Sequence, residues 1–243
     1  MEPQVYARMG EIEDRHWWFV SRRRIIADII RQCAGLPRPA RILEAGCGTG
    51  GNLAMLSRFG SVGGFEPDDA ALATASSKGL FEIRRGSLPD QVPFAQEQFD
   101  LAVMLDVLEH LDDDVACLKA LAGSLHENGY LLLTVPAYKF LWSNHDEQRH
   151  HKRRYTKRRL MKVAGDAGLD PIMVSYYNTL LFPIILAVRL VRRITGSKRD
   201  DDRLPGRIAN ALLRRVFSFE RRLIGSVPMP IGVSLLMLAR KRC

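Results

Sequence analysis

Residues 41–51 have the sequence Arg-Ile-Leu-Glu-Ala-Gly-Cys-Gly-Thr-Gly-Gly, in which an acid, Glu44, follows a short apolar run. Three glycines then stand at alternate positions: Gly46, Gly48 and Gly50. Apolar residues at helical spacing follow over 53–59 and stop at Gly60, so the segment predicts a strand, a tight turn and a helix. Glycine lets a ligand approach the backbone closely, and a helix N-terminus offers free N–H donors. This stretch therefore predicts a site for a nucleotide or a carboxylate-bearing ligand.

A second strand is predicted over 61–66, and it ends in an acid, Glu66, that lies 20 positions after Gly46 (66 − 46). In nucleotide-binding strand–helix–strand units, an acid at about this distance binds the ribose hydroxyls. Pro67 and Asp68 follow, and Asp68 is expected to cap a helix that ends near Gly79. The spacing favours a ribose-binding Glu66 over an exposed acid at a strand end.

The rest of the chain alternates strands and helices, which is typical of an α/β protein with a parallel, doubly wound sheet. Further strands are predicted at 81–85, 99–105, 130–135, 171–177 and 232–240. Ligands in such sheets bind at the carboxyl ends of the strands. The glycine turn, Glu66, Ser87 and Asp106 are all predicted to lie at such ends.

Two regions outside this alternation are predicted to be helical. Residues 11–34 are predicted to form an amphipathic helix or helix pair, with Trp17, Trp18 and Phe19 just before three arginines. This element is interpreted either as a lid over a ligand or as a helix docked on the core. About 50 residues separate the strand 171–177 from the last strand. We predict four regions: a helical lid at 1–38, the core at 39–178, a basic amphipathic helical insert at 179–228, and the final strand at 229–243.

These motifs together resemble the class I S-adenosylmethionine-dependent methyltransferases, and the broad type 11 or type 23 group in particular. The resemblance is carried by Glu-Ala-Gly-Cys-Gly-Thr-Gly from residue 44, Phe-Glu-Pro from residue 65, and Asp-Val-Leu-Glu-His from residue 106. The GxGxG spacing differs from the GxGxxG of nicotinamide enzymes. The resemblance implies a Rossmann-like seven-stranded sheet and S-adenosylmethionine as cofactor.

The resemblance also implies a set of cofactor-binding residues. They are Glu44, Gly46, Cys47, Gly48, Gly50, Glu66, Pro67, Ser87, Leu88, Leu105 and Asp106. The glycine turn would contact the methionine part, Glu66 the ribose, the 87–88 loop the adenine, and the 105–106 segment the methionyl end. Many relatives carry an acid where this chain has Ser87, so the adenine contact departs from the family pattern.

The acceptor side is predicted in the segment 142–155, which follows the fifth strand. Histidine is the side chain best suited to accept a proton near neutral pH, so His145 or His151 is the candidate catalytic base, with Asp146 orienting it. Arg153 or Arg154 is a candidate to hold an anionic acceptor. The predicted substrate-binding residues are Trp18, His110, Arg154 and Tyr155. The alternative is a loop whose histidines and arginines only cap helices and pair with acids.

No metal site is predicted. His145, Asp146, His150 and His151 are ligand types, but their spacing fits no standard metal pattern.

The net charge of +9 is unevenly distributed along the chain. Residues 1–137 hold 13 Lys/Arg and 19 Asp/Glu, whereas residues 138–243 hold 23 Lys/Arg and 8 Asp/Glu. A basic face attracts phosphates and other anions. The apolar run 180–188 beside arginines suits a lipid-like acceptor or an anionic membrane surface, or it belongs to a helical cap over the pocket. This run is shorter than the roughly 18–20 residues of a spanning helix.

The prediction is therefore a methyltransferase that acts at oxygen or nitrogen on a small-molecule or lipid-linked, anionic acceptor. The alternatives are an RNA methyltransferase and a non-catalytic S-adenosylmethionine-binding regulatory subunit. Nucleic acid is not the expected partner, because aromatic residues are not interleaved through the basic runs. Scattered cysteines without metal spacing and the lack of a signal-peptide pattern lead us to expect a cytoplasmic protein, or one peripheral to the inner face of a membrane.

Overall fold

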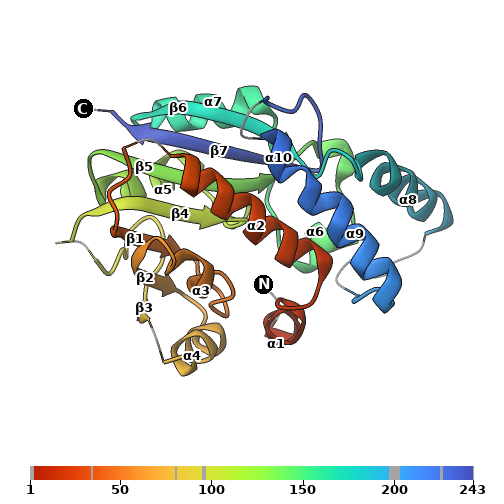
Figure 1. The fold of residues 1–243 in the computed structure, drawn as a ribbon, viewed down its shortest axis with the longest axis horizontal. Coiled ribbons are helices and arrows are strands. Elements are labelled where there is room, and N and C mark those ends of the chain that lie inside the picture. Colours follow the sequence, from red (N-terminus) through yellow and green to blue (C-terminus); the bar gives the residue numbers. More distant parts are fainter. Residues whose placement is uncertain are drawn as a thin grey trace.

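The computed structural model describes residues 3–33, 35–79, 81–94, 97–196, 203–224 and 227–242. Its centre is a seven-stranded sheet with the order β3-β2-β1-β4-β5-β7-β6 (Figure 1). The strands are β1 Ala40–Ala45, β2 Gly60–Glu66, β3 Glu82–Arg85, β4 Phe99–Leu105, β5 Leu125–Pro136, β6 Leu169–Tyr177 and β7 Ser234–Lys241. The α/β fold with a Rossmann-like seven-stranded sheet, predicted from the sequence, is confirmed.

The direction of the strands places the functional edge of the sheet. Neighbouring strands from β3 to β5 are parallel, whereas β7 runs antiparallel to both β5 and β6. The strand order reverses between β1 and β4, so their carboxyl ends border the crevice where such sheets bind ligands. The start of β7 and the end of β6 lie at the same edge, because Ser234 pairs with Pro136 and Tyr177.

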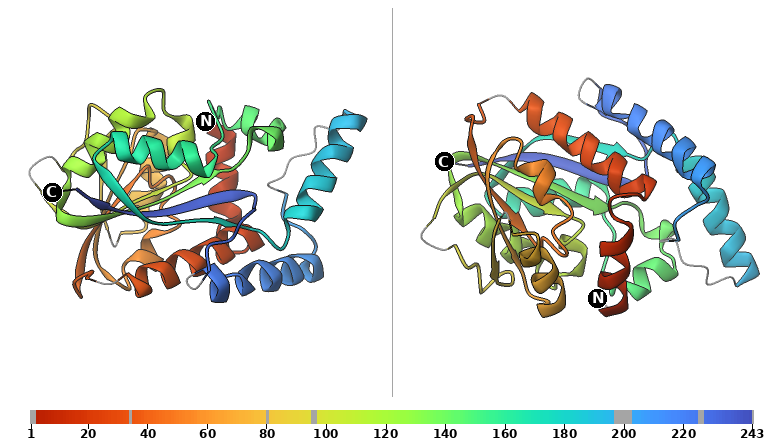
Figure 2. Two further views of the ribbon diagram at one scale, coloured as in Figure 1. Left: turned by 90° about the horizontal axis from the view of Figure 1, so that it is seen from above. Right: turned by 60° about the horizontal axis from the view of Figure 1, so that its bottom comes forward.

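Helices cover both faces of the sheet, as the view from above shows (Figure 2). The N-terminal half contributes α1 Pro3–Ile12, α2 Trp17–Gln32, α3 Leu53–Leu56 and α4 Asp69–Ser77. The middle contributes α5 Asp114–Gly123, α6 Asn144–Gln148 and α7 Lys157–Asp166. Between β6 and β7 lie α8 Phe182–Thr195, α9 Arg207–Phe219 and α10 Arg221–Ile224. No helix among the described residues is long and apolar enough to span a membrane.

Two apolar cores fix the layers. On one face, α2 contributes Ile25, Ile26 and Ile30 to a cluster that also holds Phe217 of α9. Tyr177, the last residue of β6, stacks on Phe217 with the ring centroids 6.0 Å apart. The other face packs the side chains of α5 and α7 against β4 and β5. Helices α2 and α9 thus lie side by side on this face of the sheet, with the N-terminus of α2 at the carboxyl edge (Figures 1 and 2).

Two local predictions differ from the structure. The helix expected over 53–59 is only the four-residue α3, because the chain already enters β2 at Gly60. At Gly60 the backbone packs so closely on β1 that a Cβ atom would lie 1.8 Å from the Ala40 carbonyl oxygen. So short a helix adds little dipole, and the turn itself must supply the N–H donors. The segment predicted as 11–34 is two helices, α1 and α2, which meet at a turn before the N-cap His16. The predicted caps Asp68 and Thr156 both accept backbone N–H groups.

Candidate functional site

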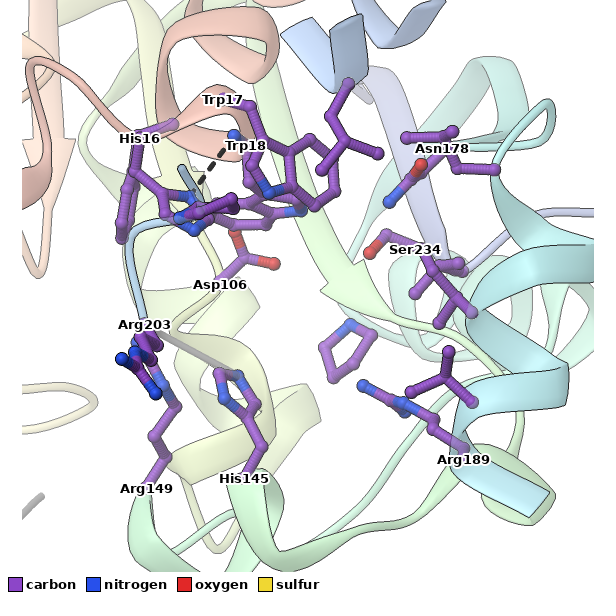
Figure 3. Close-up of a pocket in the computed structure, with 18 of the residues that line it drawn as sticks. His16, Trp17, Trp18, Asp106, His145, Arg149, Asn178, Arg189, Arg203 and Ser234 are labelled. Atoms are coloured by element: carbon purple, nitrogen blue, oxygen red, sulfur yellow. Dashed lines mark hydrogen bonds between the residues drawn. The ribbon is translucent and has the colours of Figure 1, made fainter. Parts of the chain in front are cut away.

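A cavity of about 800 Å³ opens at the carboxyl edge of the sheet (Figure 3). Its walls come from α2, the end of β4, the α6 region, the end of β6, the start of β7 and α8. The labelled lining residues are His16, Trp17, Trp18, Asp106, His145, Arg149, Asn178, Arg189, Arg203 and Ser234. Apolar side chains of α8 complete the wall, so one cavity combines a large apolar surface with several cations. Such a cavity can enclose a ligand of drug size or larger.

The glycine turn lies next to this cavity, between β1 and α3. Gly46 has φ 68°, and a Cβ atom there would lie 2.8 Å from Val107. Gly48 has φ 54° and no heavy atom within 4 Å of the position of a Cβ, so its backbone faces open space. The turn therefore needs glycine for its conformation, and at Gly48 it leaves room for a ligand against the main chain.

Glu66 stands at the end of β2 as the spacing predicts, and it is tied to the glycine turn. Its Oε2 atom accepts the N–H of Gly48 at 2.9 Å, and its Oε1 atom accepts the N–H of Asp68 at 3.1 Å. The side chain is buried, and this burial raises the pKa of Glu66. These hydrogen bonds hold the carboxylate rigidly at the end of β2, where the spacing in the sequence predicts a ribose contact.

Helix α1 contacts the same region, which sequence reasoning did not foresee. The hydroxyl of Tyr6 donates to Glu66 Oε1 at 3.2 Å, and burial raises the pKa of Tyr6, so the hydroxyl keeps its proton. Glu13, one residue beyond α1, accepts from Thr49 at 2.8 Å and pairs with Lys78 at 2.9 Å. No spacing motif links these residues to the turn, because the contacts span 36 to 65 positions in the chain.

A partly buried ion pair joins α2 to the end of β4. Arg22 pairs with Asp106, and its guanidinium carbon lies 4.5 Å from the centre of the Trp18 ring. Asp106 has φ 57°, a left-handed conformation that Asp tolerates better than most residues.

A second acid, Glu44 at the end of β1, is buried, and this burial raises its pKa to about 7, while Asn52 donates to its Oε1 atom at 2.8 Å. The Oε2 atom of Glu44 has no hydrogen-bond partner.

This chemistry fits S-adenosylmethionine. The open backbone at Gly48, the rigid carboxylate of Glu66 and the acid Asp106 on the cavity wall suit a ligand that carries a ribose diol and cationic groups. The other predicted cofactor contacts lie around this site or behind it. Cys47 and Leu105 are buried and Pro67 is exposed, whereas Gly50, Ser87 and Leu88 are partly or fully covered. Ser87 exchanges backbone hydrogen bonds with Gln91, so its loop is a tight turn.

On the acceptor side, Asp146 organises the predicted loop. Its two carboxylate oxygens accept from Arg154 at 2.8 and 2.9 Å, and its Oδ1 atom lies 2.9 Å from Nδ1 of His151. Burial alone would raise the pKa of Asp146, but the contacts with His151 and Arg154 outweigh it and hold that pKa below its ordinary value. The ionised carboxylate therefore fixes the imidazole of His151 on the cavity wall.

Two predicted substrate-binding residues do not face the cavity. Tyr155 is wholly buried, and its hydroxyl donates to Asp114 at 3.0 Å. The backbone around Tyr155 pairs with Ala137 beside the end of β5, and this pairing directs the ring into the core. His110 lies behind His151, with ring centroids 4.7 Å apart, and burial lowers its pKa to about 3. These two assignments are corrected: Tyr155 and His110 support the loop from behind.

Arg154 reaches the cavity wall, but its guanidinium is bound by Asp146 and by the carbonyl of Ala137 at 3.0 Å. It therefore anchors the loop, and the prediction that it also holds the acceptor stays a prediction. The cations that line the cavity outside this pair are Arg8, Arg149, Arg189, Arg192 and Arg203. His145 and Trp18 line the cavity as predicted from their positions.

One cluster brings three metal-type ligands together. Glu109, His110 and His151 place one ligand atom each within 4.8 Å of one another. This set differs from the His145, Asp146, His150 and His151 considered from sequence, because Arg154 already holds Asp146. Burial, with the nearby charge of Asp106, raises the pKa of Glu109 well above its ordinary value. Neither oxygen of its carboxyl group has a hydrogen-bond partner.

Sequence reasoning missed Tyr6, Arg22 and Asn178. Asn178 follows β6 with φ 58°, lines the cavity, and has a buried Oδ1 atom without a hydrogen-bond partner. The only sequence signal for it was an Asn directly after a predicted strand at the functional edge. Figure 3 shows its amide directed into the cavity from the side opposite Trp18.

Comparison with known proteins decides the family. A family model described as a methyltransferase domain, type 23, matches residues 18–174. The chain belongs to this family. The match spans α2, the glycine turn, the Asp106 segment and the acceptor loop, so the resemblance predicted from the motifs is confirmed, with S-adenosylmethionine as the cofactor of the family.

Individual relatives agree with this family assignment. A ubiquinone biosynthesis O-methyltransferase from Alkalilimnicola ehrlichii is 31% identical over 115 residues, which cover 44% of this chain and 46% of that protein. A malonyl-[acyl-carrier protein] O-methyltransferase from Enterobacter lignolyticus is 27% identical over 207 residues, covering 79% and 78%. A solved S-adenosylmethionine-dependent methyltransferase from Thermotoga maritima has the same fold, with TM-score 0.62, 18% identity, and coverage of 98% and 95%. The chain spans about half the length of the first curated relatives it matches.

Proposed function

We propose that this chain transfers the methyl group of S-adenosylmethionine to an oxygen or nitrogen of an acceptor that carries an anionic group and an apolar part. Both a small molecule and a lipid-linked compound satisfy this description. The observation that carries the proposal is the Asp146–His151 pair, which lies on the wall of a large cavity that also holds Asp106 and several arginines. Methyl transfer needs alignment of two reactants and exclusion of water, and an enclosed cavity supplies both.

The residues of the chain have distinct tasks in this proposal. When bound, S-adenosylmethionine would supply a methyl group attached to a sulfonium sulfur, and the electron pair of the broken carbon–sulfur bond would stay on that sulfur when the acceptor atom takes the methyl group. In this proposal the ionised Asp146 accepts the proton on Nδ1 of His151, which leaves the lone pair of Nε2 to act as the base. That lone pair takes the proton from the acceptor hydroxyl or amine. General-base catalysis of this kind contributes about 10²–10⁴-fold.

The cavity wall supports the acceptor class. Ile184, Ile185 and Val188 of α8 give an apolar surface, and Arg149, Arg189 and Arg203 lie on the same cavity. Arginine binds carboxylate and phosphate groups well because its planar guanidinium can donate two parallel hydrogen bonds. One of the relatives is named a ubiquinone biosynthesis O-methyltransferase and another a malonyl-[acyl-carrier protein] O-methyltransferase.

The test is transfer of label from methyl-labelled S-adenosylmethionine into an extract of the source cells. We expect label in the lipid or small-molecule fraction, and its loss with His151→Gln. The His151→Gln protein should still bind S-adenosylmethionine in calorimetry. His126→Ala, which changes an exposed histidine of β5, is the matched control and should leave the label unchanged. Label in the RNA fraction, or full activity of His151→Gln, would contradict the proposal.

His145 is the second candidate base, and the same assay separates the two histidines. His145 lines the cavity 6.1 Å from His151, measured between ring centroids, but the hydrogen bond with Asp146 belongs to His151. We therefore expect His145→Ala to retain measurable transfer. If His145→Ala abolishes transfer while His151→Gln does not, the base is His145.

A further inference from the structure

The outward face of α8 is apolar although it has no role in the cavity. We define this face as Ala187, Leu190, Val191 and Ile194, which recur at the spacing i, i+3, i+4, i+7 of one helical stripe. Leu190 is 50% exposed, Val191 58% and Ile194 85%. None of the four lines the cavity. A stripe of large apolar residues left in water is unusual for a surface helix and marks an interaction surface.

The opposite side of α8 is also apolar, because it forms the cavity wall through Ile184, Ile185 and Val188. A helix that packs on its protein through one apolar stripe ordinarily turns polar residues outward. Helix α8 instead projects from the sheet at the carboxyl edge, as both views show (Figures 1 and 2). It carries one apolar face toward the cavity and a second face toward the surroundings.

The described residues of α8, α9 and α10 carry almost only positive charges. Among the described residues between 182 and 224 there are nine arginines, and the one acid is Glu220. Glu220 is fully buried, and its Oε1 atom accepts the N–H of Leu180 at 2.8 Å. Three aspartates of the sequence, at 200–202, lie outside the described residues. Over the whole insert, 179–228, the sequence has eleven Lys/Arg against four Asp/Glu.

We propose that the outward face of α8 docks on a membrane surface rich in anionic lipid, with its apolar stripe in the interfacial layer. An apolar stripe flanked by arginines is the pattern that binds such surfaces, since the apolar side chains enter the acyl boundary and the cations meet the head groups. A second copy of this chain fits less well, because it would bring two arginine-rich faces together. The proposal concerns the surface alone and does not rest on the identity of the acceptor.

Docking in this orientation has a consequence for the cavity. Because the cavity wall and the docking face are two sides of the same helix, the cavity lies directly beside the lipid layer. An acceptor with an apolar tail could then pass from the membrane into the cavity along α8 without crossing water. Its anionic group would meet Arg189 and Arg192, which extend from α8 into the cavity lining.

The test is co-sedimentation of the full chain with lipid vesicles. We expect binding to vesicles of phosphatidylcholine mixed with phosphatidylglycerol, and much weaker binding to vesicles of phosphatidylcholine alone. Added salt should weaken the binding, because exposed charges are screened. The variant Val191→Ser/Ile194→Ser should bind the mixed vesicles at least roughly tenfold less tightly, since it removes most of the inserted apolar surface. The affinity of this variant for S-adenosylmethionine, measured by calorimetry, should equal that of the wild type. An equal affinity would show that the variant is folded.

Ile172→Ser is the matched control, because Ile172 is 55% exposed on β6, away from α8. It should bind vesicles like the wild type. Three results would overturn the proposal: no vesicle binding by the wild type, equal binding to both kinds of vesicle, or unchanged binding of the α8 variant. A wild-type dimer in size-exclusion chromatography that the α8 variant converts to a monomer, without vesicle binding, would assign this face to a second copy instead.

Discussion

The hydroxyl of Tyr6 donates to Oε1 of Glu66 at 3.2 Å, which ties the N-terminal helix α1 to the carboxylate predicted to bind ribose. Oε1 also accepts the N–H of Asp68, so both of its lone pairs are engaged. A ribose hydroxyl that binds this atom must therefore displace Tyr6. If Glu66 binds the ribose as predicted, we expect helix α1 to compete with the cofactor for the Oε1 atom.

Tyr6→Phe should bind S-adenosylmethionine more tightly than the wild type. The substitution removes one net hydrogen bond from the ligand-free state, which is about 0.5–1.5 kcal/mol or roughly a two- to tenfold lower Kd. Calorimetry measures this directly. Weaker binding by Tyr6→Phe would mean instead that Tyr6 contacts the cofactor after α1 moves.

Glu66→Ala should weaken S-adenosylmethionine binding without unfolding the protein. The change removes the acceptor for two hydroxyls, and hydrogen bonds to a charged group are each about 1.5–3 kcal/mol. We expect at least a roughly tenfold rise in Kd in calorimetry. Glu82→Ala, on the neighbouring strand β3 with an exposed carboxylate, is the matched control. Equal Kd values for the two variants would reject the ribose role of Glu66.

Asp146→Ala should destabilise the fold strongly. It leaves Arg154, whose side chain is only 2% exposed, without its partner, and an unpaired buried charge costs about 3–5 kcal/mol. Urea unfolding measures this loss. Asp166→Ala, which breaks the exposed pair with Lys162, should cost no more than about 0.5 kcal/mol. Similar unfolding midpoints for the two variants would show that Arg154 does not depend on Asp146.

The lowered pKa of Asp146 also predicts how the stability of the fold changes at acid pH. Because that pKa is lower in the folded chain than its ordinary value of 3.8, the folded state holds fewer protons on this group than the unfolded state. Its contribution to stability is therefore complete above the ordinary value and is lost as pH falls toward the folded value. Asp146→Ala should remove this part of the acid sensitivity, and urea unfolding across acid pH measures it.

Glu44 should make the protein less stable as pH rises. Its pKa is raised from 4.5 to about 7, so in that window the folded state holds more protons than the unfolded state, and the free energy of unfolding falls with pH. The full effect of such a shift is on the order of 3 kcal/mol. Glu44→Gln keeps the shape without the charge, and it should unfold at a higher urea concentration than the wild type above neutral pH. A difference that does not grow between acid and neutral pH would contradict this.

The sequence was sufficient to place the glycine turn and Glu66 because these features are built from local patterns, and the contacts of these residues with the cofactor stay predictions. The turn from Gly46 to Gly50 needs glycine for its own conformation, and Glu66 lies one strand away at a fixed distance. The acceptor half was predicted less well. Tyr155 is of a residue type that is common in binding sites, yet it lies in the core, because the pairing of its segment with Ala137 directs the ring inward. No spacing rule contains that information.

The sequence by itself determined the sheet, the glycine turn, the family and the cofactor, because strand alternation and motif spacing depend on neighbours in the chain. Only the tertiary structure decided which charges meet. Arg22 finds Asp106 across 84 positions, Tyr6 finds Glu66 across 60, and α8 acquires a cavity on one side and an uncovered apolar face on the other. These contacts arise from the packing of α2 and α9 on the sheet and from the strand order, which place distant segments at one edge.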